Sequence, residues 1–240
     1  MNIAIIGTGN IGGTLTRRLT TLGHNVSIAN SRGPASLQDL AAETGAKPGT
    51  AKEIVHGADI VIVTIPQKNI PHLPADLFAD VPETTVVIDT GNYYPKQRDG
   101  KIAEIEEGMP ESRWVEKHLG RPVIKVFNNI RAQHLLEKGL PAGAPGRIAL
   151  PVAGDDPVAK QKVMQLVDEL GFDPVDAGGW TNLGGSSQEH RATARISMLK
   201  ACAKRCRRQA RFAQRSGGPE RWKSGSARLW KPPRTLRQGS

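Results

Sequence analysis

Three glycines near the start of the chain have the spacing of a phosphate-binding loop. They belong to the segment Gly7-Thr8-Gly9-Asn10-Ile11-Gly12. In such a loop the first glycine allows a tight turn, the second lets the backbone approach a diphosphate, and the third lets a helix pack closely on a strand. The N-terminus of the following helix then faces the diphosphate. The motif predicts a dinucleotide site, and the alternative is a glycine turn with only a structural role.

About twenty residues further along, a polar triplet ends the next apolar run. It reads Asn30-Ser31-Arg32. An NAD site has an acidic residue here, which binds the ribose 2′-hydroxyl. A hydroxyl and a guanidinium instead suit a 2′-phosphate, because arginine makes charge-assisted, often bidentate, bonds to phosphate oxygens. The triplet therefore favours NADP(H) as the cofactor, whereas the alternative makes Arg32 a solvated loop residue.

Further candidates follow three later apolar runs, because ligands of open α/β sheets bind beyond the carboxyl ends of the strands. These candidates are Thr64, Ile65 and Pro66, then Asn92, then Asn128 and Asn129. We predict that they approach the nicotinamide ribose and a second substrate, although Asn is also an ordinary turn residue. His134 could act as a general acid or base, but a lone histidine is more often an exposed helix residue. No catalytic residue is assigned from the sequence.

The elements that must position these residues alternate regularly. Short apolar runs rich in β-branched residues predict strands at 2–6, 25–29, 59–65, 85–89, 122–127, 147–153 and 172–176. Helical spacing occurs between them, at 14–22, 35–43, 101–107 and 156–170. Continuous apolar strands separated by helices are typical of a mainly parallel sheet that is covered on both faces. The predicted fold is a doubly wound α/β fold, the Rossmann fold of NAD(P)-binding domains.

The charge of the chain is unevenly distributed. The formal net charge is +10, yet residues 180–240 carry 15 Lys/Arg and 2 Asp/Glu, whereas residues 1–179 carry 18 and 21. The basic segment has no valine and no clear period, which is typical of a chain that does not fold alone. We therefore divide the chain into a domain at 1–179 and a basic, disordered tail at 180–240.

The same composition limits the partners and the location. Cys202 and Cys206 lie in the tail with no neighbouring histidine, so neither a disulfide framework nor a metal site is indicated. The longest apolar run, 60–65, is too short to span a bilayer, and no secretory signal precedes the first strand. We expect a cytoplasmic protein with a small-molecule redox partner, no specific nucleic-acid partner and no membrane association, and a homodimer is compatible with these features.

The domain at 1–179 resembles a known family, the NADPH-dependent reductases of the deazaflavin coenzyme F-420. It is also similar to the cofactor-binding parts of STEAP metalloreductases and pyrroline-5-carboxylate reductases. The resemblance rests on the segments quoted above, on 126–130 and on 151–156 through 176–179. It implies that the residues from Thr8 to Ile11 hold the diphosphate and that Ser31 and Arg32 hold the 2′-phosphate. A basic residue that the family often has shortly after the Ser-Arg pair is absent from 33–37.

The resemblance also implies a reaction, the transfer of hydride between NADP(H) and a deazaflavin or flavin. Two hydride carriers need their rings juxtaposed more than they need protein acids or bases. The lack of an evident catalytic dyad in 1–179 fits this reaction. One alternative is an NADP-dependent dehydrogenase or reductase of a small carbonyl or imine substrate, although such enzymes carry a long helical C-terminal domain. A non-catalytic NADPH-binding module is a second alternative.

The family resemblance stops at Gly179, and a shifted reading frame resumes it. Starting each codon one base earlier permits Leu-Asp-Glu-Ser-Trp-Arg-Gln-Gln-Pro-Gly-Thr-Pro, which looks like the expected continuation of the family. We interpret 180–240 as the product of a one-base displacement. The alternative is a genuine basic tail that binds nucleic acid.

Overall fold

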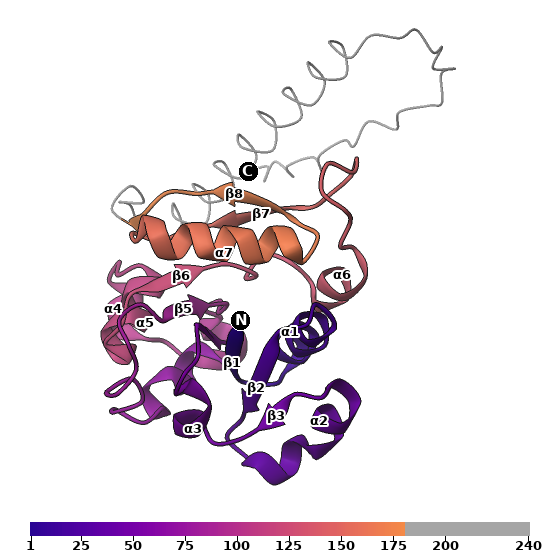
Figure 1. The fold of residues 1–240 in the computed structure, drawn as a ribbon. Coiled ribbons are helices and arrows are strands. Elements are labelled where there is room, and N and C mark those ends of the chain that lie inside the picture. The colour runs from indigo at the N-terminus through magenta and orange to yellow at the C-terminus, as the bar shows by residue number, and fades with distance from the viewer. Residues whose placement is uncertain (181–240) are drawn as a thin grey trace, which may run out of the picture. The chain divides into compact units, whose positions relative to one another are not determined.

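The computed structural model describes residues 1–180 of the protein, which Figure 1 shows in colour. The predictions made for 181–240, including the tail, the displaced frame and the two cysteines, lie outside these residues. Within the described part, no helix is long and apolar enough to cross a membrane.

Six parallel strands form the main sheet, in the order β3-β2-β1-β4-β5-β6. Their bounds are β1 Asn2–Ile6, β2 Asn25–Ala29, β3 Lys47–Pro48, β4 Ile60–Val63, β5 Val86–Asp89 and β6 Val123–Lys125. The chain moves outward from β1 to β3, returns to β4 beside β1, and then moves outward in the other direction to β6. This reversal between β1 and β4 is the switch point of a doubly wound sheet, so the predicted fold is confirmed.

Helices cover both faces of this sheet (Figure 1). The α-helices are α1 Asn10–Thr21, α2 Gln38–Thr44, α3 Ala51–Val55, α4 Ala103–Glu106, α5 Glu111–Leu119, α6 Ala132–Glu137 and α7 Pro157–Glu169. Shorter helical turns are η1 Pro34–Leu37, η2 Gln67–His72 and η3 Pro95–Asp99. Alternate residues of β1 face opposite sides, since Ile5 packs in the core under α1 and α7 whereas Ile6 packs in the core under α3 and α5.

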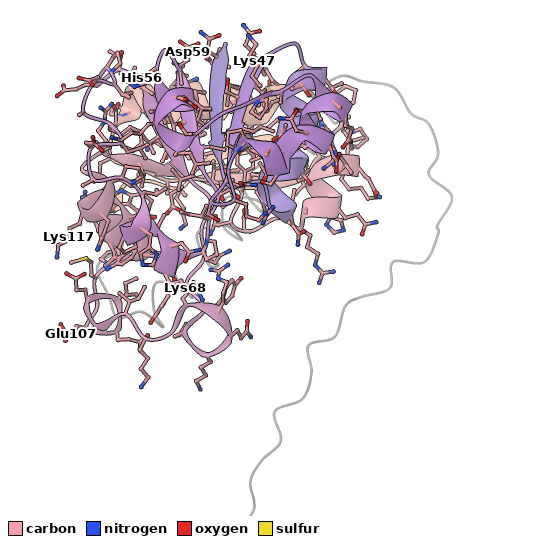
Figure 2. All side chains as sticks on the ribbon, turned by 90° about the horizontal axis from the view of Figure 1, so that it is seen from below. Lys47, His56, Asp59, Lys68, Glu107 and Lys117 are labelled. Atoms are coloured by element: carbon pink, nitrogen blue, oxygen red, sulfur yellow. The ribbon has the colours of Figure 1, made fainter. Side chains whose placement is uncertain are left out.

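Charged side chains cover the outside of this core. Lys47 and Lys117 are exposed and point outward from the body (Figure 2).

The ends of α7 show how the sequence sets the bounds of a helix. The Asp156 side chain accepts hydrogen bonds from the N–H groups of Val158 and Ala159, and Gly171 follows the helix with a φ of 88°.

The predicted strands at 147–153 and 172–176 do not extend the main sheet. They form β7 Ala149–Val152 and β8 Asp173–Asp176, a separate parallel pair. A single antiparallel bridge between Lys125 and Ala153 joins β7 to the end of β6. The next hydrogen-bonded pair would join Phe127 to Pro151, but Pro151 has no N–H and Phe127 has a φ of 63°. The ladder therefore stops after one bridge.

Trp180 is the last residue that the structure describes, and the sequence analysis assigned it to the tail. Its side chain is instead buried, with 7% of the residue exposed. Its backbone N–H donates to Asp155 Oδ1 at 2.8 Å and its indole Nε1 donates to Glu116 Oε1 at 3.1 Å. The packed body thus extends at least to Trp180.

Candidate cofactor site

The glycine loop joins β1 to α1, and its three glycines have different environments. Gly7 has a φ of +100°, and a Cβ added to it would lie 2.5 Å from the Thr64 carbonyl oxygen. A Cβ on Gly12 would lie 1.9 Å from the Gly7 carbonyl oxygen. Gly9, by contrast, has no atom within 4 Å of its added Cβ. Gly7 and Gly12 are required by packing, whereas Gly9 borders open space that a ligand can enter.

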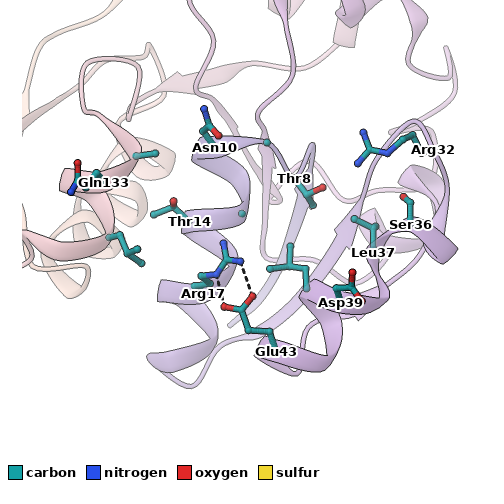
Figure 3. A pocket seen from close by; sticks show the side chains of 15 residues that line it. Thr8, Asn10, Thr14, Arg17, Arg32, Ser36, Leu37, Asp39, Glu43 and Gln133 are labelled. Atoms are coloured by element: carbon teal, nitrogen blue, oxygen red, sulfur yellow. Dashed lines mark hydrogen bonds and ion pairs between the residues drawn. The ribbon is translucent and has the colours of Figure 1, made fainter.

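A cavity of about 570 Å³ lies beside this loop (Figure 3). Its walls come from the glycine loop with α1, from the segment after β2 with α2, and from α6. The lining residues are Thr8, Gly9, Asn10, Gly13, Thr14, Arg17, Arg32, Ser36, Leu37, Asp39, Leu40, Glu43, Ala132, Gln133 and Leu136. Four of the candidates from the sequence, Thr8, Gly9, Asn10 and Arg32, meet in this one cavity.

The triplet after β2 divides into a structural residue and exposed residues. Asn30 Oδ1 accepts the Arg32 N–H at 2.9 Å, and Asn30 Nδ2 donates to Ser36 Oγ at 2.9 Å. Ser36 in turn donates to the Gly33 carbonyl at 2.8 Å. Asn30 therefore orders the turn, while Ser31 and Arg32 are exposed. Ser36 also lines the cavity, a position that was not predicted from the sequence.

An ion pair that lines the cavity was also not predicted from the sequence. Arg17 on α1 donates to Glu43 on α2 through both Nε and Nη2, at 2.6 and 2.7 Å (Figure 3). The hydrogen bond from Arg17 holds the pKa of Glu43 below its usual value. The two residues are 26 positions apart in the sequence, so no local spacing indicates the contact. The position of Arg17, seven residues after Asn10 on the same helix, is the only available signal.

Other candidates support the loop or lie outside the cavity. Thr64, Ile65 and Pro66 are half-buried after β4, where Gly7 packs against Thr64 and Ile65. Ile11 is half-buried and packs on the core. Asn129 is exposed in the loop that follows β6, and it does not line this cavity.

The loops after β5 and β6 are clasped by two asparagines. Asn92 Nδ2 donates to the Asn128 carbonyl at 2.7 Å, and Asn128 Nδ2 donates to Asn92 Oδ1 at 3.4 Å. Phe127, next to the clasp, is the one non-glycine residue with positive φ in the part of the chain that the structure describes. Such strained backbone is concentrated at functional sites. Both asparagines were predicted as site candidates from the sequence, whereas their mutual contact was not.

The segment after Asn92, which follows β5, is held together by the side chain of Asp99. Asp99 has a fully buried side chain that accepts the N–H of Tyr94 at 2.8 Å and pairs with Arg98 at 2.9 Å. Burial alone would raise the pKa of Asp99, but the bonds from Arg98 and the backbone amides outweigh it and lower the pKa. The Arg98 guanidinium also lies over the exposed Tyr94 ring, 5.2 Å from its centroid.

A buried ion pair underlies these loops. Asp89 Oδ2 accepts hydrogen bonds from Lys125 Nζ at 2.8 Å and from Ser112 Oγ at 3.1 Å, and Asp89 Oδ1 accepts the Gly91 N–H at 2.7 Å. Only 2% of Asp89 is exposed. The pair ties the end of β5 to the end of β6, which fixes the spacing of the clasped loops.

Replacing Lys125 by Met should therefore destabilise the fold, because it leaves the Asp89 carboxylate buried without its cation. We expect a loss of about 3 kcal/mol in the free energy of unfolding, measured by urea denaturation. Lys117→Met is the matched control, since Lys117 pairs with Glu104 at the surface and should cost less than about 1 kcal/mol. Equal losses in the two variants would contradict a stabilising role for the buried pair.

The chain is similar to one protein family, to a protein matched over a short stretch, and to solved structures. The family described as NADP oxidoreductase, coenzyme F420-dependent, matches residues 2–93. A 39-residue stretch is 56% identical to the Escherichia coli (strain K12) protein YjhV. The chain covers 28% of that relative's length.

Two solved structures cover most of the domain. Protein SMa0349 of Sinorhizobium meliloti, a hypothetical protein, is 31% identical with a TM-score of 0.64, and the match covers 77% of this chain and 88% of that one. A protein of Arthrobacter sp. FB24, provisionally described as an F420-dependent NADP-reductase, is 22% identical with a TM-score of 0.63. That match covers 83% of this chain and 90% of the other, and it bears on the fold alone.

Proposed function

We propose that the chain is a member of the family of coenzyme F420-dependent NADP oxidoreductases, which matches residues 2–93, and that it transfers hydride between NADP(H) and a deazaflavin or flavin. The observation that carries the proposal is the cavity that joins the open face of Gly9 to Arg32. An open glycine at a helix N-terminus suits a diphosphate, and an exposed guanidinium at the end of β2 suits a 2′-phosphate.

The residues fit the cofactor along its length. The N–H groups at the start of α1, near Gly9 and Asn10, would hold the diphosphate, and Ser31 with Arg32 would hold the 2′-phosphate. The adenosine would occupy the cavity between α1, α2 and α6. The nicotinamide end would then lie toward Thr64, Ile65 and Pro66 and toward the Asn92–Asn128 clasp, at the carboxyl edge of the sheet.

Bound NADPH supplies the hydride, so the protein's task is to orient two rings. The clasp and the ion pair beneath it hold the loops after β5 and β6 in one arrangement. Orientation of this kind accelerates a transfer without a protein acid or base at the reacting atoms. Transfer without a protein acid or base agrees with a site whose loops are held by the Asn92–Asn128 contacts and the Asp89–Lys125 ion pair.

A screen of hydride acceptors tests the proposal. NADPH oxidation should be followed with a deazaflavin, FMN, riboflavin, and small carbonyl and imine compounds. We expect turnover with a deazaflavin or a flavin. Turnover only with carbonyl or imine compounds would support the alternative reductase, and NADPH binding without turnover of any acceptor would support a non-catalytic module.

We also propose that the sequence from residue 180 onward is read in a displaced frame, and that residues 1–179 belong to the NADP-binding domain. In the shifted reading, leucine replaces Trp180, so the buried position keeps an apolar side chain. The abrupt change in composition after Gly179, to a basic segment without valine, supports this interpretation.

Restoring the frame by one base should raise turnover with the acceptor and leave the Kd for NADPH within about twofold, because the proposed cofactor residues all precede Gly179. Steady-state kinetics and NADPH titration of the two chains give this comparison. A restored chain with no higher turnover would contradict the displaced frame. Salt-sensitive DNA binding that is lost when the chain is cut after Trp180 would favour the genuine basic tail.

A further inference from the structure

The formal charges of the residues that line the cavity cancel. The cavity is lined by two basic residues, Arg17 and Arg32, and by two acidic residues, Asp39 and Glu43. A 2′-phosphate adds nearly two negative charges. Among the residues that the structure describes, Arg32 forms no ion pair with a carboxylate, whereas Arg17 is paired with Glu43. One guanidinium without a carboxylate partner would therefore have to balance a dianionic group.

The segment after Arg32 supplies no second cation. Residues 33–37 read Gly-Pro-Ala-Ser-Leu, and only Ser36 and Leu37 among them line the cavity. Any further positive charge must come from another wall. Arg17 is the only other basic residue that lines the cavity in the described part of the chain.

Arg17 is well placed to supply this charge. Its guanidinium folds back along α1, with Nη1 at 3.4 Å from the point where a Cβ of Gly13 would lie. The side chain therefore lies against the first turns of the helix whose N-terminus faces the proposed diphosphate. Its side chain is 40% exposed, so it can reorient within the cavity. Figure 3 shows Arg17 and Arg32 on different walls, with Thr8 between them.

We propose that Arg17 is the second cation of the 2′-phosphate site and that Glu43 competes with the phosphate for it. This inference rests on the proposed NADP(H) binding. The guanidinium fork that now binds both Glu43 carboxylate oxygens also matches two phosphate oxygens. Because exposed ion pairs contribute little to stability, exchange of one anion for the other costs little.

At neutral pH the Glu43 carboxylate is charged and competes with the 2′-phosphate for Arg17. The bond from Arg17 lowers the pKa of Glu43, so the carboxylate stays charged. Glu43 also brings a negative charge to the wall that the phosphate approaches. The pair thus sets how strongly the pocket distinguishes NADPH from NADH: Arg17 raises the preference for NADPH, and Glu43 lowers it.

Titration of full-length variants with NADPH and NADH tests the proposal. Arg17→Met keeps the apolar stem and should weaken NADPH about tenfold, with NADH changed less than twofold. Arg17→Lys keeps the charge and should recover part of the loss. Glu43→Gln should tighten NADPH about threefold and leave NADH unchanged. The control variants are Lys52→Met and Asp76→Asn, an exposed ion pair outside the cavity, and neither should alter binding.

The outcomes separate this inference from the proposed function. Failure of the parent chain to bind NADPH more tightly than NADH contradicts the proposed function itself. With that preference present, equal losses of NADPH and NADH in Arg17→Met would overturn the proposal, because Arg17 would then contact the adenosine rather than the phosphate. Unchanged or weaker NADPH binding by Glu43→Gln would overturn the competition. Circular dichroism checks that each variant is folded.

Discussion

Replacing Gly9 by Val should abolish NADPH binding while the protein stays folded. The added Cβ meets no atom within 4 Å beyond the residues next to it in the sequence, so we expect the fold to keep most of its stability. The valine side chain would instead occupy the space where the diphosphate approaches the backbone. We expect a loss of more than about a hundredfold in affinity, measured by NADPH titration, and an unchanged melting temperature.

Gly12→Ala is the matched contrast within the same loop. Its Cβ would lie 1.9 Å from the Gly7 carbonyl oxygen, a backbone atom that cannot move aside alone. We expect a loss of at least about 2 kcal/mol in the free energy of unfolding. Undiminished NADPH binding by Gly9→Val would show that the loop is only a structural turn.

The second large effect concerns the choice between the two nicotinamide cofactors. Arg32→Ala should weaken NADPH by about ten- to hundredfold, because loss of a charge-assisted bond costs roughly 1.5–3 kcal/mol. NADH should change by less than twofold, since it lacks the phosphate. Lys47→Ala is the control, because Lys47 is an exposed cation on β3 that does not line the cavity (Figure 2). Equal affinity of the parent chain for NADH and NADPH would contradict the role of Arg32.

The strands of the main sheet were largely predictable from the sequence. The bounds of β1 and β2 match the prediction, because each is an apolar run that ends at a glycine or a polar triplet. Two elements were missed for a local reason. Strand β3 has two residues, too few for any periodicity, and α3 has five, although its Thr50–Glu53 capping box is visible in the sequence.

Other elements differ because tertiary contacts decide them. Helix α1 begins at Asn10, four residues before the predicted start, because the glycine segment itself forms the first turn. The nine-residue α5 was missed although it buries Trp114 and Val115. The separation of β7 and β8 from the main sheet depends on Phe127 and Pro151, and the sequence does not indicate that these two residues would face each other.

The candidate site shows the same division. Motif spacing locates Gly9 and Arg32 because both follow strand ends, where topology alone brings them together. Spacing does not locate Arg17 and Glu43, since their contact depends on how α1 and α2 lie across the cavity. Nor does spacing locate the Asp89–Lys125 pair. In the sequence alone, Asp89 is an ordinary polar residue at a strand end and Lys125 is an ordinary solvated lysine.

The walls of the cofactor cavity are anchored unequally. Arg18 donates to the carbonyls of Leu136 and Leu170, at 2.9 and 2.6 Å, and so ties α1 to α6 and to the end of α7. Helix α2 has seven residues, none of them fully buried, and its ion pair to α1 is exposed. Segments with few buried contacts open at low free energy. The cavity therefore has one firmly anchored side and one weakly anchored side, and we expect any change in its width to come from displacement of α2 rather than of the glycine loop.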